Sequence, residues 1–258
     1  MRTVNATRYV TPLREGGSLP AVVEADDDGL YVLKFRGAGQ GRKALIAELL
    51  AGELARAAGL PLPEIVFVQL DAELARTEPD AEIQDLIRAS AGLNLALDYL
   101  PGSVAYDPLV HRVDADLASA IVWHDAFTTN VDRTPRNVNL LMWHRQLWLI
   151  DHGAALIFHH QWDGYLERST QPFPAIKDHV LLNVASRIAE VDARMVERLP
   201  AEVVTRIVEL LPDDWLEDTP HFSSPREQRE AYRHYLMARL QAPRRFVEEA
   251  VGARAVHV

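Results

Sequence analysis

Apolar and polar residues alternate in short runs over the first 35 residues, as they do in β-strands. The runs lie at residues 9–10, 20–24 and 30–35, and turn-forming stretches separate them at 14–18 and 25–29. Successive strands joined by short turns pair in antiparallel fashion. This part of the chain therefore predicts a three-stranded meander.

Between residues 42 and 58 the spacing of the apolar residues lengthens to that of a helix. Leucine and isoleucine recur every three or four positions, Gly59 provides a C-terminal cap, and Pro61 stops the helix. The pattern that follows predicts a strand at 64–70, a short helix at 81–89 and a strand at 93–100.

A Pro-Gly pair at 101–102 marks a predicted boundary between two domains, residues 1–100 and residues 101–258. In order, the second domain is predicted to contain a helix at 114–128, a polar segment at 129–137, hairpin strands at 138–143 and 147–150, and mostly helices at 179–250. The first domain is thus rich in strands and the second in helices.

Composition narrows the class of protein. Of the 258 residues, 48% are hydrophobic and 25% are charged, which is enough for a packed core. The absence of cysteine excludes disulfides, thiolate metal sites and a thiol nucleophile, and it favours a reducing cytoplasm. A net charge of -10 argues against broad nucleic-acid binding. No apolar stretch approaches the ~18–20 residues of a membrane span, so we expect no membrane partner.

Three oxygen-bearing side chains carry the candidate chemistry. Asp132 and Asn137 lie five residues apart in the polar segment, and Asp151 follows the hairpin in Asp151-His152-Gly153. A phosphotransferase needs a carboxylate for the acceptor hydroxyl and oxygen ligands for magnesium. Asp132 suits the first role, and Asn137 and Asp151 suit the second, with Gly153 permitting a sharp turn. Taken singly, each of them is also typical of a turn cap.

The segment Asp132-Arg133-Thr134-Pro135-Arg136-Asn137, followed by Asp151-His152-Gly153, resembles the catalytic and metal-binding loops of HipA-like kinases. Phosphatidylinositol kinases carry a similar loop. The resemblance implies an α+β, bilobal protein-kinase-like fold, with a small antiparallel sheet in the N-terminal lobe and a mainly helical C-terminal lobe. It also implies ATP and Mg²⁺ as cofactors, Asp132 as the catalytic base, and Asn137 and Asp151 as the metal ligands.

Lys34 is the only lysine of the apolar run at 30–35, and it matches the phosphate-contacting lysine of the family. A lysine exposed on an edge strand is the alternative. A carboxylate from the next helix should hold this lysine against the phosphates. The family pattern points to Glu48, whereas helical periodicity puts Glu53 nearer the middle of the apolar stripe. We choose Glu48 and keep Glu53 as its rival.

Two segments are predicted to bind the nucleotide through backbone groups, namely Gly16-Gly17-Ser18 and Asp98-Tyr99-Leu100. The first would cover the phosphates, and a plain hairpin turn is an equal alternative. Ser18 is also a candidate for autophosphorylation. The second resembles the hinge that binds the adenine edge, and it is assigned by order along the chain.

Other polar residues near the motif have less specific interpretations. Asn130 would brace the loop and Arg133 would contact phosphate, with turn capping and a surface salt bridge as the alternatives. Four residues could suggest zinc, namely His152, His159, His160 and Asp163. Their spacing matches no metal motif, so we interpret 152–177 as a variable activation or substrate loop.

Two functional hypotheses follow. The first is an ATP-dependent kinase. Its preferred acceptor is a protein serine or threonine, a small-molecule hydroxyl is the second choice, and a membrane lipid is the third. The second is a catalytically silent nucleotide-binding scaffold or regulatory module, against which the acid and the metal ligands count. HipA toxins carry a substantial N-terminal subdomain, and only about eight residues precede the first predicted strand here. We therefore do not carry over their translation-related substrate or their DNA-binding antitoxin partner.

Overall fold

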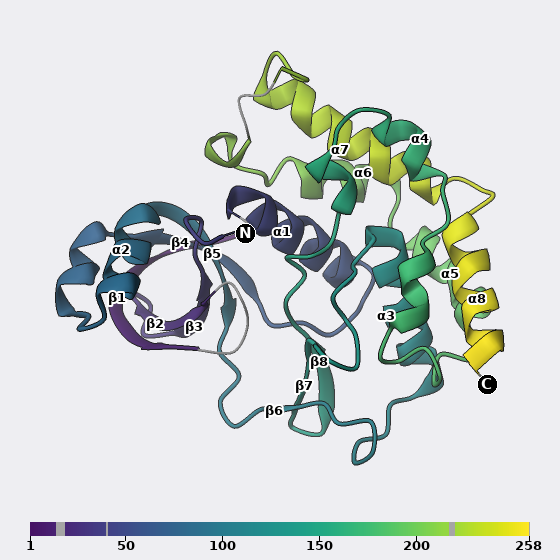
Figure 1. The fold of residues 1–258 in the computed structure, drawn as a ribbon, viewed down its shortest axis with the longest axis horizontal. Helices are drawn as coiled ribbons and strands as arrows, with labels where there is room; N and C mark the ends of the chain where they lie inside the picture. The colour runs from purple at the N-terminus through teal and green to yellow at the C-terminus, as the bar shows by residue number, and fades with distance from the viewer. Residues whose placement is uncertain (14–18, 40, 217–219, 258) are drawn as a thin grey trace.

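The computed structural model describes residues 1–13, 19–39, 41–216 and 220–257. It is a mixed α+β fold in which a small β-barrel lies beside a larger, mainly helical part (Figure 1). The first hundred residues contain β1 (Thr3–Pro12), β2 (Ala21–Ala25), β3 (Leu30–Lys34), α1 (Gly41–Ala57), β4 (Ile65–Leu70), the 3₁₀ helix η1 (Ala72–Thr77), α2 (Ala81–Ala89) and β5 (Gly92–Asp98). The rest contains β6 (Val104–Ala105), α3 (Ala115–Thr128), β7 (Leu140–Trp143), β8 (Gln146–Leu149), η2 (Ile157–His160), α4 (Tyr165–Ser169), η3 (Pro174–Asp178), α5 (Ile188–Glu197), α6 (Ala201–Val208), η4 (Asp213–Trp215), α7 (Pro225–Leu240) and α8 (Arg245–His257).

Five strands close into a barrel in the order β1-β2-β3-β5-β4. The predicted meander is confirmed, because β1, β2 and β3 pair in antiparallel fashion. The expectation of a wholly antiparallel sheet is wrong at one pairing: residues 3–5 of β1 run parallel to residues 67–69 of β4. Two register shifts against β2 bend the ten-residue β1, so that it reaches both neighbours and closes the barrel.

The strand β1 begins at Thr3, ahead of the predicted run at 9–10. The pattern of residues 3–8 is weak because Val4 is the only fully buried side chain among them. Pairing with β2 and β4, rather than burial of an apolar face, holds this segment. The number of residues ahead of the first strand is therefore smaller than the pattern indicates.

The other elements predicted in residues 42–150 are confirmed, with ends that move by one or two residues. The cap predicted for α1 is present, because Gly59 has a φ of 78° and Leu60 N donates to the carbonyl of Ala55 at 2.9 Å. The side chain of Asp114 caps α3 by accepting from two backbone N–H groups. The short elements η1 and β6 were not predicted, because so few residues show no period.

The helices predicted over residues 179–250 are confirmed as α5, α6 and α7, and α8 continues to His257. Pro200 and Pro212 stand at the breaks before α6 and η4, and Pro225 begins α7. Among the residues that the structure describes, no helix combines the length and the apolarity that a bilayer crossing requires.

Apolar side chains gather into two separate cores. One fills the barrel, and the other joins the apolar side of α1 to α3, α5, α6, α7 and α8. Trp215 fastens this second core to the barrel, since its Nε1 donates to the carbonyl of Leu93 at 3.1 Å and its ring meets Phe67 edge to face. Thus α1, which is inserted between two barrel strands in sequence, packs with the helices of the second half.

Candidate active site

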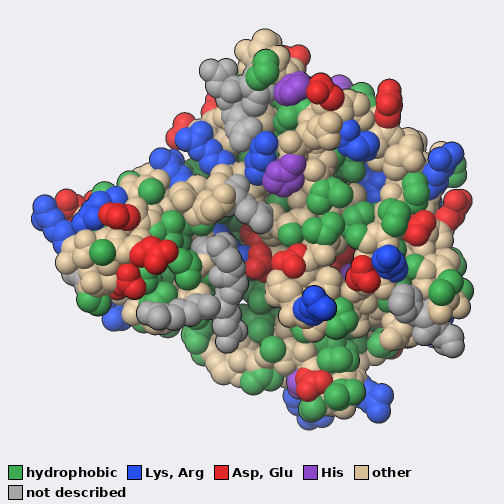
Figure 2. Space-filling model, viewed as in Figure 1, with side chains coloured by type: hydrophobic (Ala, Val, Ile, Leu, Met, Phe, Trp, Pro, Cys, Tyr) green, Lys and Arg blue, Asp and Glu red, His purple; other side chains and the backbone are tan. Residues whose placement is uncertain are grey.

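A cavity of about 190 Å³ opens where β3, α1 and the loops on either side of the β7–β8 hairpin meet. Five side chains singled out from the sequence line it: Lys34, Glu48, Asp132, Asn137 and Asp151. Figure 2 shows acidic side chains gathered beside the barrel, near the middle of the face drawn. The fold thus brings the candidates for phosphate, metal and acceptor binding together from distant parts of the chain.

Two carboxylates hold Lys34, the last residue of β3. Its Nζ lies 2.6 Å from Oδ1 of Asp151 and 3.5 Å from Oε2 of Glu48. The side chain of Lys34 is 12% exposed and that of Glu48 is 1% exposed. Lys34 is therefore in the wall of the cavity rather than in open solvent.

Burial and charge act in opposite directions on this pair. Burial alone would lower the pKa of the Lys34 ammonium, but Glu48 and Asp151 outweigh it and raise the pKa above its ordinary value. Burial alone would raise the pKa of Glu48, but Lys34 and the hydrogen bonds from His152 lower it to about 2. Both groups are therefore charged at neutral pH, as a phosphate-binding lysine and its partner must be.

Glu53, the rival to Glu48, faces another way. Its carboxylate pairs with Arg56, three residues further along α1. Five residues on a helix turn a side chain by roughly 140° at 100° per residue. Glu48 and Glu53 therefore cannot face the same point, and the structure places Glu48 against Lys34.

A left-handed backbone conformation at Asp151, with a φ of 53°, makes the turn after β8. Gly153 has no positive φ, so the prediction that it provides the sharp turn is wrong. An aspartate tolerates this region better than most residues. The next peptide is held from α1, because His152 N–H donates to Glu48 Oε2 at 2.8 Å. Glu48 thus contacts both Lys34 and the segment that carries Asp151.

Amide side chains fix the loop around Asp132. Asn137 Nδ2 donates to Asp132 Oδ2 at 2.6 Å, and Asn139 Nδ2 donates to the carbonyl of Asp132 at 3.3 Å. Asn130 Oδ1 accepts from the N–H of Asp132 at 3.1 Å, so it braces the loop through a turn-capping bond. Because Asn137 donates through its nitrogen, its side-chain oxygen is the atom that suits a cation.

Arg133 points into the protein, and its interpretation as a phosphate contact or a surface salt bridge is wrong. Its side chain is 0% exposed, and its Nε lies 2.6 Å from Oδ2 of the equally buried Asp125. Nη1 donates to the carbonyls of Asn139 and Ile150. His179 Nε2 lies 2.9 Å from the same oxygen of Asp125. A buried ion pair therefore lies behind the loop that carries the candidate base.

Burial would raise the pKa of Asp125, but Arg133 and His179 hold it well below its usual range. Burial lowers the pKa of His179, against the pull of the Asp125 carboxylate. Asp125 and His179 were not predicted as site residues from the sequence. The sequence does hold a signal for Asp125, because it is the single acid in the stretch 118–127, which is apolar except for Ser119, His124 and Asp125 itself.

A family model for HipA-like kinases matches residues 7–246. The chain belongs to the HipA-like kinase family. No curated protein matches it. Its fold is similar to the crystal structure of the Helicobacter pylori proinflammatory kinase CtkA, with a TM-score of 0.55 and 12% identity over 99% of this chain and 98% of that one. It is also similar to the Golgi casein kinase with Mn/ADP bound, with a TM-score of 0.54 and 12% identity over 98% of this chain and 74% of that one. This HipA-like kinase is thus a phosphotransferase with a kinase fold.

The glycine turn of this HipA-like kinase, Gly16-Gly17-Ser18, lies outside the described residues. The strands on either side of it pair up to their ends, where Leu13 N donates to the carbonyl of Pro20 at 2.7 Å. The predicted role of the turn over the phosphates therefore stays a prediction.

The predicted hinge lies at the end of β5, away from Lys34. Asp98 is opposite Tyr31 in the β3–β5 pairing. The N–H groups of Asp98 and Tyr99 already donate to backbone carbonyls of the barrel region. Asp98, Tyr99 and Leu100 are not among the residues that line the cavity. The lining of the cavity therefore does not include the hinge candidate, and its contact with adenine stays a prediction.

A second glycine-containing stretch does reach the cavity. Ala38, Gly39 and Gly41, between β3 and α1, line it. This stretch was not predicted from the sequence, although its glycines lie between the candidate phosphate lysine and the start of a helix. The N–H groups of Ala38 and Gly41 already donate within this stretch, to the carbonyls of Phe35 and Ala38.

Of the histidines in segment 152–177, His159 and His160 contact each other, with ring centroids 4.6 Å apart. His159 is buried in η2, with Nδ1 3.1 Å from the hydroxyl of Tyr232, and burial lowers its pKa well below the ordinary value. His152 lies beside Glu48. In the described ranges, no three His, Cys, Asp or Glu side chains are grouped as a metal site requires. The segment itself contains η2, α4 and most of η3.

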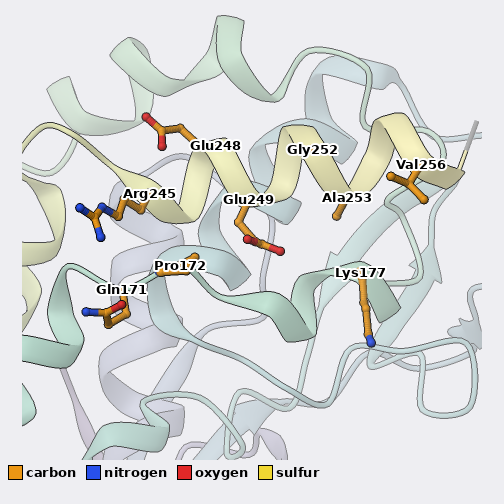
Figure 3. Close-up of a pocket in the computed structure, with 9 residues that line it drawn as sticks. All are labelled: Gln171, Pro172, Lys177, Arg245, Glu248, Glu249, Gly252, Ala253 and Val256. Carbon is orange, nitrogen blue, oxygen red and sulfur yellow. The ribbon is translucent and has the colours of Figure 1, made fainter.

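A larger cavity, of about 690 Å³, lies between α8 and residues 171–177 (Figure 3). Glu249 points from α8 toward that segment, whereas Glu248 points away from it. Lys177 and Arg245 add positive charge to the lining. None of the five candidate residues lines this cavity. We therefore take the smaller cavity as the candidate active site, because its side chains suit phosphoryl transfer.

Proposed function

We propose that this HipA-like kinase transfers the γ-phosphate of ATP to a hydroxyl group, with a protein serine or threonine as the first choice of acceptor. The convergence of Lys34, Asp132, Asn137 and Asp151 on one cavity supports the proposal. Phosphoryl transfer depends almost entirely on positioning and on electrostatic stabilisation. The placement of these groups therefore matters more than any single reactive atom.

The charges of the cavity favour a divalent cation. Its lining carries one ammonium, on Lys34, against three carboxylates, on Glu48, Asp132 and Asp151, which is an excess of two negative charges. A polyphosphate would be repelled from such a site unless cations accompanied it. Asn137 and Asp151 supply the hard oxygen ligands that Mg²⁺ prefers, and we propose that they hold it. A bound Mg²⁺ would neutralise the phosphate charge that develops during transfer.

The remaining roles follow from the contacts around each side chain. Lys34, held by Glu48, would pair with the phosphates of the nucleotide. Asp132, held by Asn137, would orient the acceptor hydroxyl and accept its proton. Glu48 would act on the nucleotide through Lys34, and we assign it as the positioning carboxylate of that lysine.

We further propose that residues 1–100 and 101–258 act as the two lobes of a bilobal kinase. The cavity supports this division, because β3 and α1 form one wall and the loops beside β7 and β8 form the other. Gly16-Gly17-Ser18 over the phosphates and Asp98-Tyr99-Leu100 at the adenine belong to the same proposal. The cytoplasmic location and the absence of a nucleic-acid partner stay predictions.

The test is the transfer of labelled phosphate from ATP and Mg²⁺ to the protein itself and to proteins of a lysate. Wild type should transfer labelled phosphate, whereas the rate of transfer should be about 10²–10⁴-fold lower in Asp132→Asn and Asp151→Ala. Asp85→Asn, at an exposed acid of α2, is the matched control and should label as wild type does.

Each alternative has its own outcome. Equal labelling by wild type, Asp132→Asn and Asp151→Ala would contradict the proposed chemistry. Saturable Mg²⁺-dependent ATP binding without transfer would favour the silent scaffold. Label recovered in small molecules of the lysate rather than in protein would move the acceptor to the second choice.

A further inference from the structure

We infer that the buried cluster of Asp125, Arg133 and His179 sets the positions of Asp132 and Asp151 relative to each other. Arg133 is then a positioning residue for phosphoryl transfer, and the inference rests on the proposed function of the cavity. None of the three cluster residues lines the cavity. They act through the backbone of the residues that do.

Arg133 connects the two functional loops directly. It follows Asp132 in the sequence, and its Nη1 donates to the carbonyl of Ile150 at 3.1 Å. Ile150 is the residue before Asp151. The same nitrogen also donates to the carbonyl of Asn139, at the start of the hairpin. One side chain therefore joins the neighbour of the candidate base to the neighbour of the candidate metal ligand.

Asp125 anchors the guanidinium of Arg133 from a rigid element. It lies in the last turn of α3, a helix in which every residue from 118 to 128 is buried. Its Oδ2 accepts from Arg133 Nε at 2.6 Å, and its Oδ1 accepts from Asn130 Nδ2 at 3.2 Å. Asn130 in turn caps the N–H of Asp132. Asp125 thus holds the loop both before and after the candidate base.

His179 brings the segment that follows Asp151 back to the same cluster. Its Nε2 lies 2.9 Å from Asp125 Oδ2, and the N–H of Val180 donates to the carbonyl of Arg133 at 3.1 Å. Residues 152–178 therefore begin beside the candidate metal ligand and end on the cluster. A rearrangement of this segment would be transmitted to Asp132 through Asp125 and Arg133.

The cluster needs an arginine rather than any cation. A guanidinium is planar and donates in several fixed directions, so Arg133 reaches a carboxylate and two carbonyls at once. A lysine at this position keeps the charge but can satisfy fewer of these buried acceptors. Arg133→Lys is therefore a test of geometry at constant charge.

The experiment compares Arg133→Lys and His179→Gln with a matched variant, Arg244→Lys. Arg244 forms an ion pair with Asp192 in the helical part, at 2.8 Å from Nε to Oδ1, and the other side-chain hydrogen bonds of the pair go to Trp123 and Leu240. Arg133→Lys and His179→Gln should lower kcat about 100-fold, because a misplacement near 1 Å has that effect, and should leave KM for ATP within about threefold. Arg244→Lys should leave kcat per folded molecule unchanged, whatever its melting temperature.

A second measurement does not depend on turnover. Native-state hydrogen exchange should speed up in both 130–139 and 149–153 in His179→Gln, and in neither in Arg244→Lys. Faster exchange only near residue 179, or an unchanged kcat in Arg133→Lys and His179→Gln, would overturn the inference. If wild type transfers no phosphate, the proposed function fails, while the exchange pattern still decides whether the cluster couples the loops. If Arg133→Lys does not fold, His179→Gln decides alone.

Discussion

Two clusters of charged side chains differ in their access to solvent. The cavity cluster consists of Lys34, Glu48 and Asp151, and the buried cluster consists of Asp125, Arg133 and His179. In the cavity cluster Lys34 is 12% exposed and Asp151 is 38% exposed. In the buried cluster Asp125 and Arg133 are both 0% exposed. Each cluster joins segments that are far apart in the sequence, yet only one of them can meet a ligand.

The difference in access separates two uses of the same chemistry. An ion pair that reaches a cavity can exchange one partner for a phosphate or a cation at modest cost. A sealed ion pair has no alternative partner, and losing one member leaves a charge buried without compensation. We therefore expect the loss of a charge to cost more stability in the buried cluster than at Asp151, the most exposed member of the cavity cluster.

The largest effect is expected from Asp125→Ala. Removing this carboxylate leaves Arg133 buried without its counter-ion, and such losses cost about 3–5 kcal/mol. Urea unfolding of the variant against wild type measures the difference. Asp192→Ala is the control, because its partner Arg244 is 19% exposed and can be hydrated, so the loss should be smaller.

A double substitution tests the reason for that loss. Asp125→Leu combined with Arg133→Met removes both charges and should recover part of the stability lost by Asp125→Ala, while phosphate transfer stays low. Equal destabilisation by Asp125→Ala and Asp192→Ala would show that burial does not distinguish the two ion pairs.

Acid should weaken the cavity cluster through Glu48. Its pKa is lowered from 4.5 to about 2 in the folded protein, so its contribution is complete above pH 4.5 and is lost as the pH falls toward 2. A difference of this size corresponds to about 3 kcal/mol. The measurement is the free energy of unfolding between pH 6 and pH 2.5 for wild type and Glu48→Gln.

The Glu48→Gln curve should be flatter below pH 4.5, because the variant lacks the carboxyl group whose pKa is lowered in the folded protein. Parallel curves would mean that Lys34 and His152 do not hold this carboxylate ionised. The pH dependence expected from Lys34 has the opposite sign, because its pKa is raised above the ordinary value of 10.5. Its contribution to stability is complete below pH 10.5 and is lost as the pH rises through the raised pKa.

Ligand binding should stabilise the protein through the cavity cluster alone. A non-hydrolysable ATP analogue with Mg²⁺, at about 100 times its Kd, adds about 2.7 kcal/mol and should raise the melting temperature by roughly 5–10 °C. Asp151→Ala should lose most of this shift, because it removes a proposed ligand of the cation. Arg244→Lys should keep it. If Asp151→Ala keeps the full shift in melting temperature, Asp151 is not a ligand of the cation.

The same contrast explains which site residues the sequence could reveal. Asp132, Asn137 and Asp151 occur in a short motif whose spacing carries information, and Lys34 stands alone in an apolar run. Their convergence on one cavity could be expected because a hairpin returns the chain to its start. The inward direction of the Arg133 side chain could not be expected, because an arginine in a polar segment usually faces solvent. Its buried partner, Asp125, comes from the preceding helix.

Local patterns also revealed most elements of the fold but not how the barrel closes. Apolar spacing predicts α1 and α3 because each buries a long stretch. The parallel pairing of residues 3–5 with 67–69 depends on backbone hydrogen bonds between distant segments, which leave no apolar period. Likewise, the left-handed residue of the turn is Asp151, which also contacts Lys34, whereas composition alone favoured Gly153.

The smallest effect is expected from Glu53→Gln, which sharpens the comparison within α1. Glu53 pairs with Arg56 along the helix, and pairs of this kind contribute about 0.3–0.5 kcal/mol. Its loss should change stability by no more than that and should leave kcat unchanged, whereas Glu48→Gln should lower kcat because Lys34 loses the carboxylate 3.5 Å from its Nζ. The measurement is kcat from steady-state kinetics of the two variants. Normal transfer by Glu48→Gln together with lost transfer by Glu53→Gln would reverse the assignment of the lysine's partner, because two acids about 140° apart on one helix cannot both serve the same cavity.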